Sequence, residues 1–103
     1  MQPTTITSSL DDFVIIPRRR SDVVENVLDL EAILFDPVCG ATHRLNETAL
    51  AVWRQCDGIT STRQIAERLG DDYEVDPETA LQHVEQLIVV FAEAGLLDMD
   101  NRA

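Results

Sequence analysis

The residues best suited to chemistry are two cysteines and two histidines: Cys39, Cys56, His43 and His83. No two of them stand at the short spacing that is typical of a structural metal site. A site that the fold assembles from Cys39, His43 and His83 is the one metal arrangement left open, and we expect none. The chain also has no glycine-rich phosphate loop and no Ser, Cys or Thr nucleophile with an obvious base. The sequence therefore predicts a protein that is not an enzyme and that requires no metal or other cofactor.

Main-chain recognition of a peptide is a different chemistry, and it requires an open strand edge beside an apolar groove. The helix predicted from Pro77 to about Ala94 has more apolar residues than one buried stripe needs. Its predicted core face holds Leu81, Val84, Ile88 and Phe91. A neighbouring row holds His83, Leu87, Val90 and Ala94, with Val89 beyond both. Three interpretations remain open: the sheet curls around this helix, the protein forms a homodimer there, or a groove accepts an apolar ligand.

The elements that must position these residues begin with three strands, predicted at residues 23–29, 32–35 and 41–45. A turn at Leu30-Glu31 joins the first two strands. Asp36-Pro37 and Gly40 favour a tight turn between the second and the third. Because the connections are short, the strands are predicted to form an antiparallel meander.

Three helices follow the strands. Asn46 has a side chain that can cap the first helix, which is predicted to include Trp53 and Cys56 and to stop at Asp57-Gly58. Ser61 and Gln64 have the spacing of a capping box, and the second helix is predicted at residues 62–69, with Gly70 as its end. Asp76-Pro77 begins the third helix. We expect Trp53 to anchor the core and Leu96-Leu97 to fold back over it. The predicted fold is α+β and winged-helix-like, with a three-stranded antiparallel sheet before three helices.

The charge and the length of the chain limit the classes of protein to which it can belong. The 103 residues predict one domain and carry a formal charge of -11, with eight arginines and no lysine. Such a chain repels nucleic acids and anionic membrane surfaces. It has no export signal and no apolar run of membrane-spanning length, so we expect a cytoplasmic protein with free thiols. Residues 1–12 are predicted to be a flexible segment, residues 13–98 the domain and residues 99–103 a tail.

The only basic cluster is Arg18-Arg19-Arg20. It has two interpretations, a solvated patch that pairs with nearby acids and a docking patch for an acidic partner.

Several short motifs in a fixed order resemble the PqqD family. They are the Asp36-Pro37 turn with Gly40, the run Leu45-Asn46-Glu47-Thr48-Ala49, then Trp53, Cys56-Asp57-Gly58, and Gly95-Leu96-Leu97. The resemblance covers roughly residues 16–98. The family consists of small recognition domains that bind the leader segment of a ribosomally made precursor peptide. They present it to a modifying enzyme, often a radical SAM enzyme or a peptidase and cyclase pair.

The resemblance implies that a leader peptide adds as a fourth strand beside the third strand and packs on the third helix. The backbone hydrogen bonds would come from Ala41, Thr42, His43, Arg44 and Leu45. Helical geometry, rather than the family motif, selects His83, Leu87, Val90 and Ala94 as the groove.

Two functions of other classes remain as alternatives. One is a structural subunit or dimeric partner of a larger enzyme, which would use the apolar helix face. The other is a winged-helix regulator that binds DNA. The charge opposes it, because the helix at residues 61–69 offers only Arg63 and Arg68 against Glu67.

Overall fold

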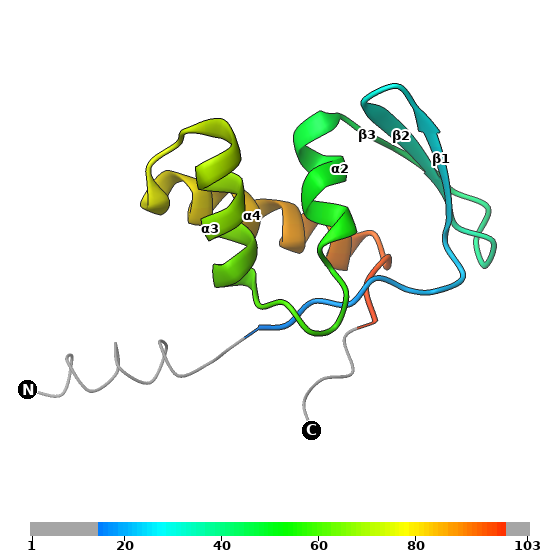
Figure 1. The fold of residues 1–103 in the computed structure, drawn as a ribbon. Coiled ribbons are helices and arrows are strands. Elements are labelled where there is room, and N and C mark those ends of the chain that lie inside the picture. Colours follow the sequence, from blue (N-terminus) through cyan, green and yellow to red (C-terminus); the bar gives the residue numbers. More distant parts are fainter. Residues whose placement is uncertain (1–14, 99–103) are drawn as a thin grey trace, which may run out of the picture.

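The computed structural model describes residues 15–98 of the chain (Figure 1). Three strands come first and three helices follow: β1 (Val24–Leu28), β2 (Glu31–Phe35), β3 (Thr42–Leu45), α2 (Glu47–Arg54), α3 (Thr62–Tyr73) and α4 (Pro77–Glu93). The predicted α+β order is confirmed. The predicted flexible segment at residues 1–12 and the predicted tail at 99–103 lie outside the described residues.

The sheet has the order β1-β2-β3, and both strand pairs are antiparallel. Side chains alternate between its faces, so Ala32, Leu34 and Leu45 are buried against the helices. The turn between β2 and β3 is as predicted, with Gly40 at a φ of 78° and its amide bonded to the Asp36 carbonyl. The first turn is shifted by one residue from the prediction. Asp29 takes the left-handed conformation, which Asp tolerates, and Glu31 is already part of β2.

Helix α2 begins where β3 ends. The Asn46 side chain accepts a hydrogen bond from the Ala49 amide at 2.9 Å, which confirms the predicted cap. The helix ends at Arg54, before the predicted Cys56. The guanidinium of Arg19, from the segment before β1, donates to the carbonyls of Trp53, Arg54 and Cys56. This side chain satisfies the carbonyl groups that an ending helix leaves without partners.

Helix α3 has the predicted capping box, with reciprocal hydrogen bonds between Ser61 and Gln64. Its predicted end at Gly70 is wrong, because the helix continues to Tyr73 and Glu74 forms the left-handed cap. Gly70 instead allows the backbone at Val75 to pass close to the helix. A Cβ atom at this position would lie 3.0 Å from the carbonyl oxygen of Val75, which returns past the helix.

Helix α4 starts with the Asp76 cap and Pro77, as predicted. Val84, Ile88 and Phe91 are buried, whereas Ala80 takes the deep position predicted for the half-buried Leu81. Leu96 and Leu97 close over the core as expected.

The core is organised around Trp53 of α2, which is 1% exposed. Its ring meets Phe91 of α4 edge-on, with ring centroids 5.3 Å apart. The indole Nε1 donates to a carboxylate oxygen of Glu25 on β1 at 2.9 Å. Trp53 therefore connects the sheet to two helices, as its predicted role as a core anchor requires.

All three residues of the arginine cluster are engaged within the domain. Arg18 pairs with Asp98 at 3.1 Å, and Arg20 pairs with Asp22 and Asp36. Arg19 caps α2, as described above. The interpretation of pairing with nearby acids is confirmed for Arg18 and Arg20, and the cluster attaches the segment before β1 to the rest of the domain.

Acid should weaken the domain through Asp36, which is 3% exposed. Hydrogen bonds from Arg20 and from the Val38 amide lower the pKa of this carboxyl to about 2. An unfolded Asp titrates near 3.9. Because the folded pKa is the lower one, the stabilising contribution is present above about pH 4 and is lost as pH falls toward about 2. Urea unfolding at a series of pH values should show this decline. The Asp36→Asn variant, although less stable, should show a smaller one; an equal decline in both proteins would contradict the assignment.

Candidate functional site

Strand β3 leaves one side of the sheet open, because within residues 15–98 it pairs only with β2. The Asp36 amide donates to the Ala41 carbonyl at 2.9 Å, which fixes the hydrogen-bonding phase of this strand pair. Antiparallel pairs alternate, so the main-chain groups of Ala41, His43 and Leu45 point toward β2. Those of Thr42 and Arg44 point away from it. We call these outward groups of Thr42 and Arg44 the β3 edge.

The predicted strand residues thus have two different positions. Only Thr42 and Arg44 present main-chain groups for another strand. Leu45 also has its side chain in the core, where it is buried. A sequence-based register could not make this division, because it depends on which residues of β2 and β3 exchange hydrogen bonds.

Three of the four predicted helix residues come together. His83, Leu87 and Val90 line a cavity of about 260 Å³, which we call the α4 cavity. Ala94 is half-buried one turn further along and is not part of the lining. Four lining residues were not predicted: Asn46, Thr48, Ala49 and Gln86. Since α2 follows β3 without a linker, its first turn lies at the end of the strand, and this adjacency in sequence was the available signal.

His43 lies on the core-facing side of the sheet, opposite Leu34 in the register. Its Nε2 atom is buried and has no hydrogen-bond partner among the described residues. The predicted site residue is therefore partly buried beneath the β3 edge rather than part of the α4 cavity lining.

A comparison with known protein families assigns the chain to a family. Residues 31–97 match the family model described as "Coenzyme PQQ synthesis protein D (PqqD)", from β2 to the last residues of the core. The chain belongs to the PqqD family. The predicted resemblance is confirmed. No curated protein matches the sequence significantly.

Two solved structures are similar to this PqqD-family domain. One is described as TbiB1 in complex with the TbiA(beta) leader peptide. It has 20% identity and a TM-score of 0.72, and the match covers 84% of this chain and 98% of the other; it shows the fold. The second is the PqqD truncation of Methylobacterium extorquens PqqCD, described as a functional, stand-alone recognition element for ribosomally synthesised and post-translationally modified peptides. It has 26% identity and a TM-score of 0.64, and the match covers 84% of this chain and 90% of the other.

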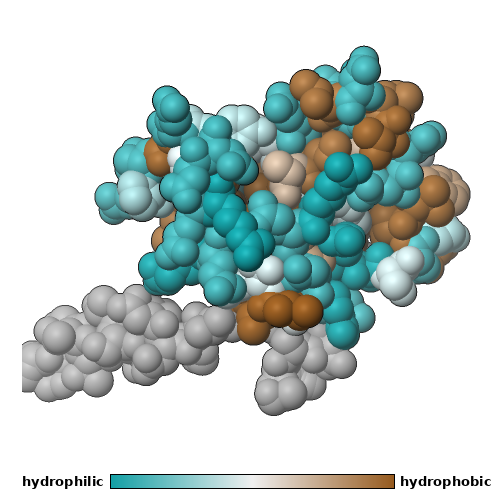
Figure 2. Space-filling model, viewed as in Figure 1, coloured by the Kyte–Doolittle hydropathy of each residue, from teal (hydrophilic) through white to brown (hydrophobic). Residues whose placement is uncertain are grey.

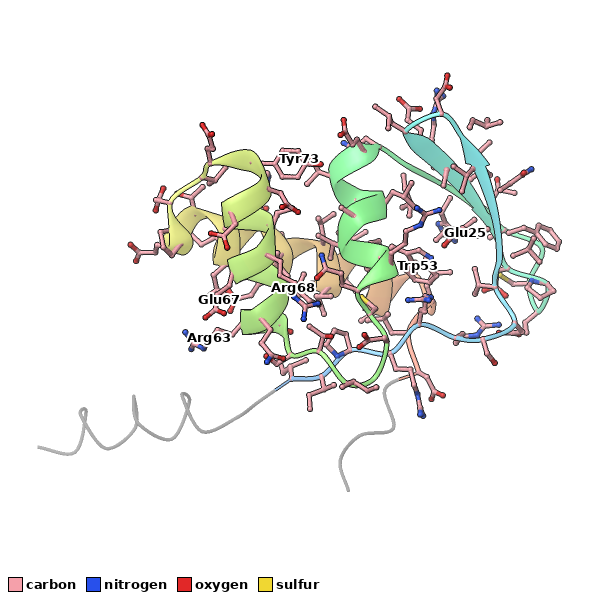
Figure 3. The ribbon with its side chains drawn as sticks, in the orientation of Figure 1. Glu25, Trp53, Arg63, Glu67, Arg68 and Tyr73 are labelled. Carbon is pink, nitrogen blue, oxygen red and sulfur yellow. The ribbon has the colours of Figure 1, made fainter. Side chains whose placement is uncertain are left out.

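In the alternative of a DNA-binding regulator, α3 of the PqqD-family domain would be the recognition helix and would need an excess of basic residues. Figure 3 labels three of its charged side chains, Arg63, Glu67 and Arg68; the other two are Asp71 and Asp72. Glu67 opposes the two arginines, and Arg68 donates to the side chain of Gln55 at 3.2 Å. This surface has no excess of basic residues sufficient for phosphate contacts.

The cysteines of the domain have different environments. Cys39 is exposed in the turn after β2, whereas Cys56 is buried and burial raises the pKa of its thiol to about 12. A thiol with this pKa is protonated at neutral pH and is a poor nucleophile. Within residues 15–98, no three or more His, Cys, Asp or Glu side chains form a group that could hold a metal ion. No helix in the same range is long and apolar enough to cross a membrane.

Proposed function

We propose that this domain binds the leader segment of a ribosomally synthesised precursor peptide and performs no catalysis. The leader would add as a fourth strand at the β3 edge and insert a side chain into the α4 cavity. Membership of the PqqD family and the open β3 edge beside this cavity carry the proposal. The two similar structures, one of a protein bound to a leader peptide and one of a stand-alone recognition element, support it.

The two parts of the site suit the two requirements of peptide recognition. Main-chain hydrogen bonds to Thr42 and Arg44 are available to any extended sequence, so they supply affinity with little selectivity. The α4 cavity supplies selectivity through its apolar residues Ala49, Leu87 and Val90 and its polar rim. Its volume of about 260 Å³ lies below the usual range of whole small-molecule pockets, roughly 300–1,000 Å³. This size favours one side chain of a longer ligand.

The role in the cell would be to present the bound leader to a modifying enzyme, such as a radical SAM enzyme or a peptidase and cyclase pair. The domain would act in the cytoplasm and require no cofactor.

A chemical-shift titration with synthetic leader peptides, encoded near the gene, tests the proposal. Perturbations should concentrate at Thr42, Arg44, His83, Leu87 and Val90. A scrambled peptide of the same composition should cause none. An unchanged spectrum with every neighbouring leader would overturn the proposal.

Thr42→Pro should weaken leader binding roughly tenfold, because proline removes an outward amide that pairs with the added strand. The ladder to β2 should persist, since this amide points away from it. Thr42→Val is the matched control, as it keeps the amide and the approximate shape of the side chain. Calorimetry on both variants separates the amide from the side chain. Equal affinities would exclude main-chain pairing at this residue.

A further inference from the structure

The sheet has a second open side, at β1. Within the described residues β1 pairs only with β2, and its register is regular over five residues. Hydrogen-bonded pairs alternate along both strand pairs, so the phase fixed between β2 and β3 also fixes the phase between β1 and β2. In this phase, the main-chain groups of Glu25 and Val27 point away from β2. We call these outward groups the β1 edge. Natural edge strands are usually protected by short length, charged side chains, proline, a bulge or covering chain. The one charged side chain of β1, Glu25, is turned toward α2. The strand Val24–Leu28 has no proline, lysine or bulge, and all five of its residues are exposed.

The outer face next to the β1 edge is mainly apolar, with Asn26 and Glu31 as its polar side chains. Val24 lies opposite Phe35 in the register, and Leu28 and Leu30 follow at the end of the strand. These four side chains are between 40% and 62% exposed. In the space-filling view, hydrophobic residues gather over the sheet, whereas the surface over α3 is largely hydrophilic (Figure 2).

Charge is arranged so that like charges do not meet at this edge. The one acid within β1, Glu25, turns toward α2, where its carboxylate accepts from Trp53 and Arg54 (Figure 3). Asp71 and Asp72 are in the last turn of α3, and Glu74 and Asp76 are in the connection from α3 to α4, at the opposite end of the molecule from the sheet (Figure 1). These four acids are therefore distant from the β1 edge, whereas Asp22, Asp29 and Glu31 lie next to β1.

We propose that the β1 edge pairs with the same edge of a second copy of this chain. The occupant follows from self-complementarity. In an antiparallel pair centred on Asn26, Val24 lies opposite the partner's Leu28, and Glu25 lies opposite the partner's Val27. The outward groups of Glu25 and Val27 then form hydrogen-bonded pairs on both sides of the two-fold axis. The apolar outer face continues from one copy to the other.

The neighbouring registers are less favourable, because like charges lie opposite each other. Centring the pair on Glu25 places two glutamates together. Centring it on Val27 places Glu25 opposite the partner's Asp29. The Asn26 register avoids both arrangements and brings the partner's Asp29 to Val23. Here Val23 and Arg19 help to line a second cavity of about 330 Å³. The charged residues that line this cavity are three arginines, Arg18, Arg19 and Arg20, and two acids, Glu25 and Asp57. The partner's Asp29 would therefore meet a small excess of positive charge.

The resulting dimer is a six-stranded sheet with a β3 edge at each end. This inference does not depend on the proposed function, because the β1 edge and the β3 edge are on opposite sides of the sheet. If both proposals hold, one dimer binds two peptides.

Sedimentation equilibrium of the full chain tests the proposal. The wild-type protein should show a reversible rise in mass, with concentration, toward twice the chain mass of 11.5 kDa. Asn26 is exposed and faces its own copy across the axis, so Asn26→Asp and Asn26→Lys should each weaken the dimer on the order of fivefold. An equimolar mixture of the two variants should restore association. Val27→Pro, which removes an outward amide, should weaken the dimer without disrupting the ladder to β2.

Three results would overturn the proposal: a wild-type monomer at all accessible concentrations, dimers of unchanged affinity in both charge variants, or no recovery in the mixture. Thr42→Pro is the control at the other edge, and it should dimerise like the wild type. Loss of leader binding in this control together with normal dimerisation keeps the two proposals distinguishable.

Discussion

Val90→Asp is expected to abolish leader binding and to leave the domain folded. Val90 is 56% exposed in the free protein, so its side chain contributes little to the core. In the proposed complex the same side chain contacts the peptide in the α4 cavity. A carboxylate there would lose its water without gaining a partner, and an unpaired buried charge is strongly unfavourable. We expect a loss of affinity of roughly 100-fold or more, which corresponds to about 2.7 kcal/mol. Leu87→Asp should act in the same direction.

Val89→Asp is the matched control for this experiment. Val89 is 52% exposed on the same helix but does not line the α4 cavity. Both variants introduce the same charge and have similar effects on helix propensity, so their difference isolates the cavity. Titration calorimetry with one leader peptide gives the two affinities, and circular dichroism checks the fold. Similar affinities for the two variants would place the peptide elsewhere.

Trp53→Ala should have the largest effect on stability. Removing a large aromatic side chain from a packed core typically costs about 3–5 kcal/mol. Here the change also removes the edge-on contact with Phe91 and leaves the Glu25 carboxylate without the indole donor. Small domains have a total stability of only about 5–15 kcal/mol. The midpoint of urea unfolding should therefore fall sharply, and the variant should be partly unfolded at ambient temperature.

Two variants divide this effect into its parts. Trp53→Phe keeps an aromatic ring against Phe91 but lacks the donor to Glu25, so its loss should be clearly smaller. Arg54→Ala changes the exposed neighbour, whose pair with Glu25 is 3.3 Å long, and should cost little. If Arg54→Ala destabilised the domain as much as Trp53→Ala, the ion pair rather than the aromatic core would connect the sheet to α2.

The elements that could be predicted from sequence are those with local signals. Asn46, the Ser61 and Gln64 pair, and Asp76-Pro77 each bond within their own first turn, and the structure confirms all three helix starts. The helix ends were less predictable. Gly70 is a usual stop signal, but here it makes room for a chain that returns past it. The end of α2 is set by Arg19, which is more than thirty residues earlier in the sequence.

In the candidate site, too, the features set within one helix could be predicted, whereas those set by contacts between elements could not. The period of α4 was enough to place His83, Leu87 and Val90 on one row, and the structure brings these three to one cavity. Helical period could not show which strand amides point outward, because this depends on the bond between Asp36 and Ala41. It also could not show that Ala94 lies beyond the cavity, since the extent of the lining depends on the position of the first turn of α2.

The contacts of Arg20 determine the order in which the domain can be completed during synthesis. Its guanidinium donates to Asp36 after β2 and to the carbonyl of Gly95 after α4, and its amide donates to Leu96. The ribosome makes the segment before β1 first. Two of the residues that Arg20 contacts, Gly95 and Leu96, are made more than seventy residues later. The hairpins and helices can form as they emerge, because their contacts are local. The segment before β1 can take its final place only after α4 has left the ribosomal tunnel. A nascent chain stalled before Gly95 should therefore remain sensitive to proteases near Arg20 and become resistant once the last residues of the core are released.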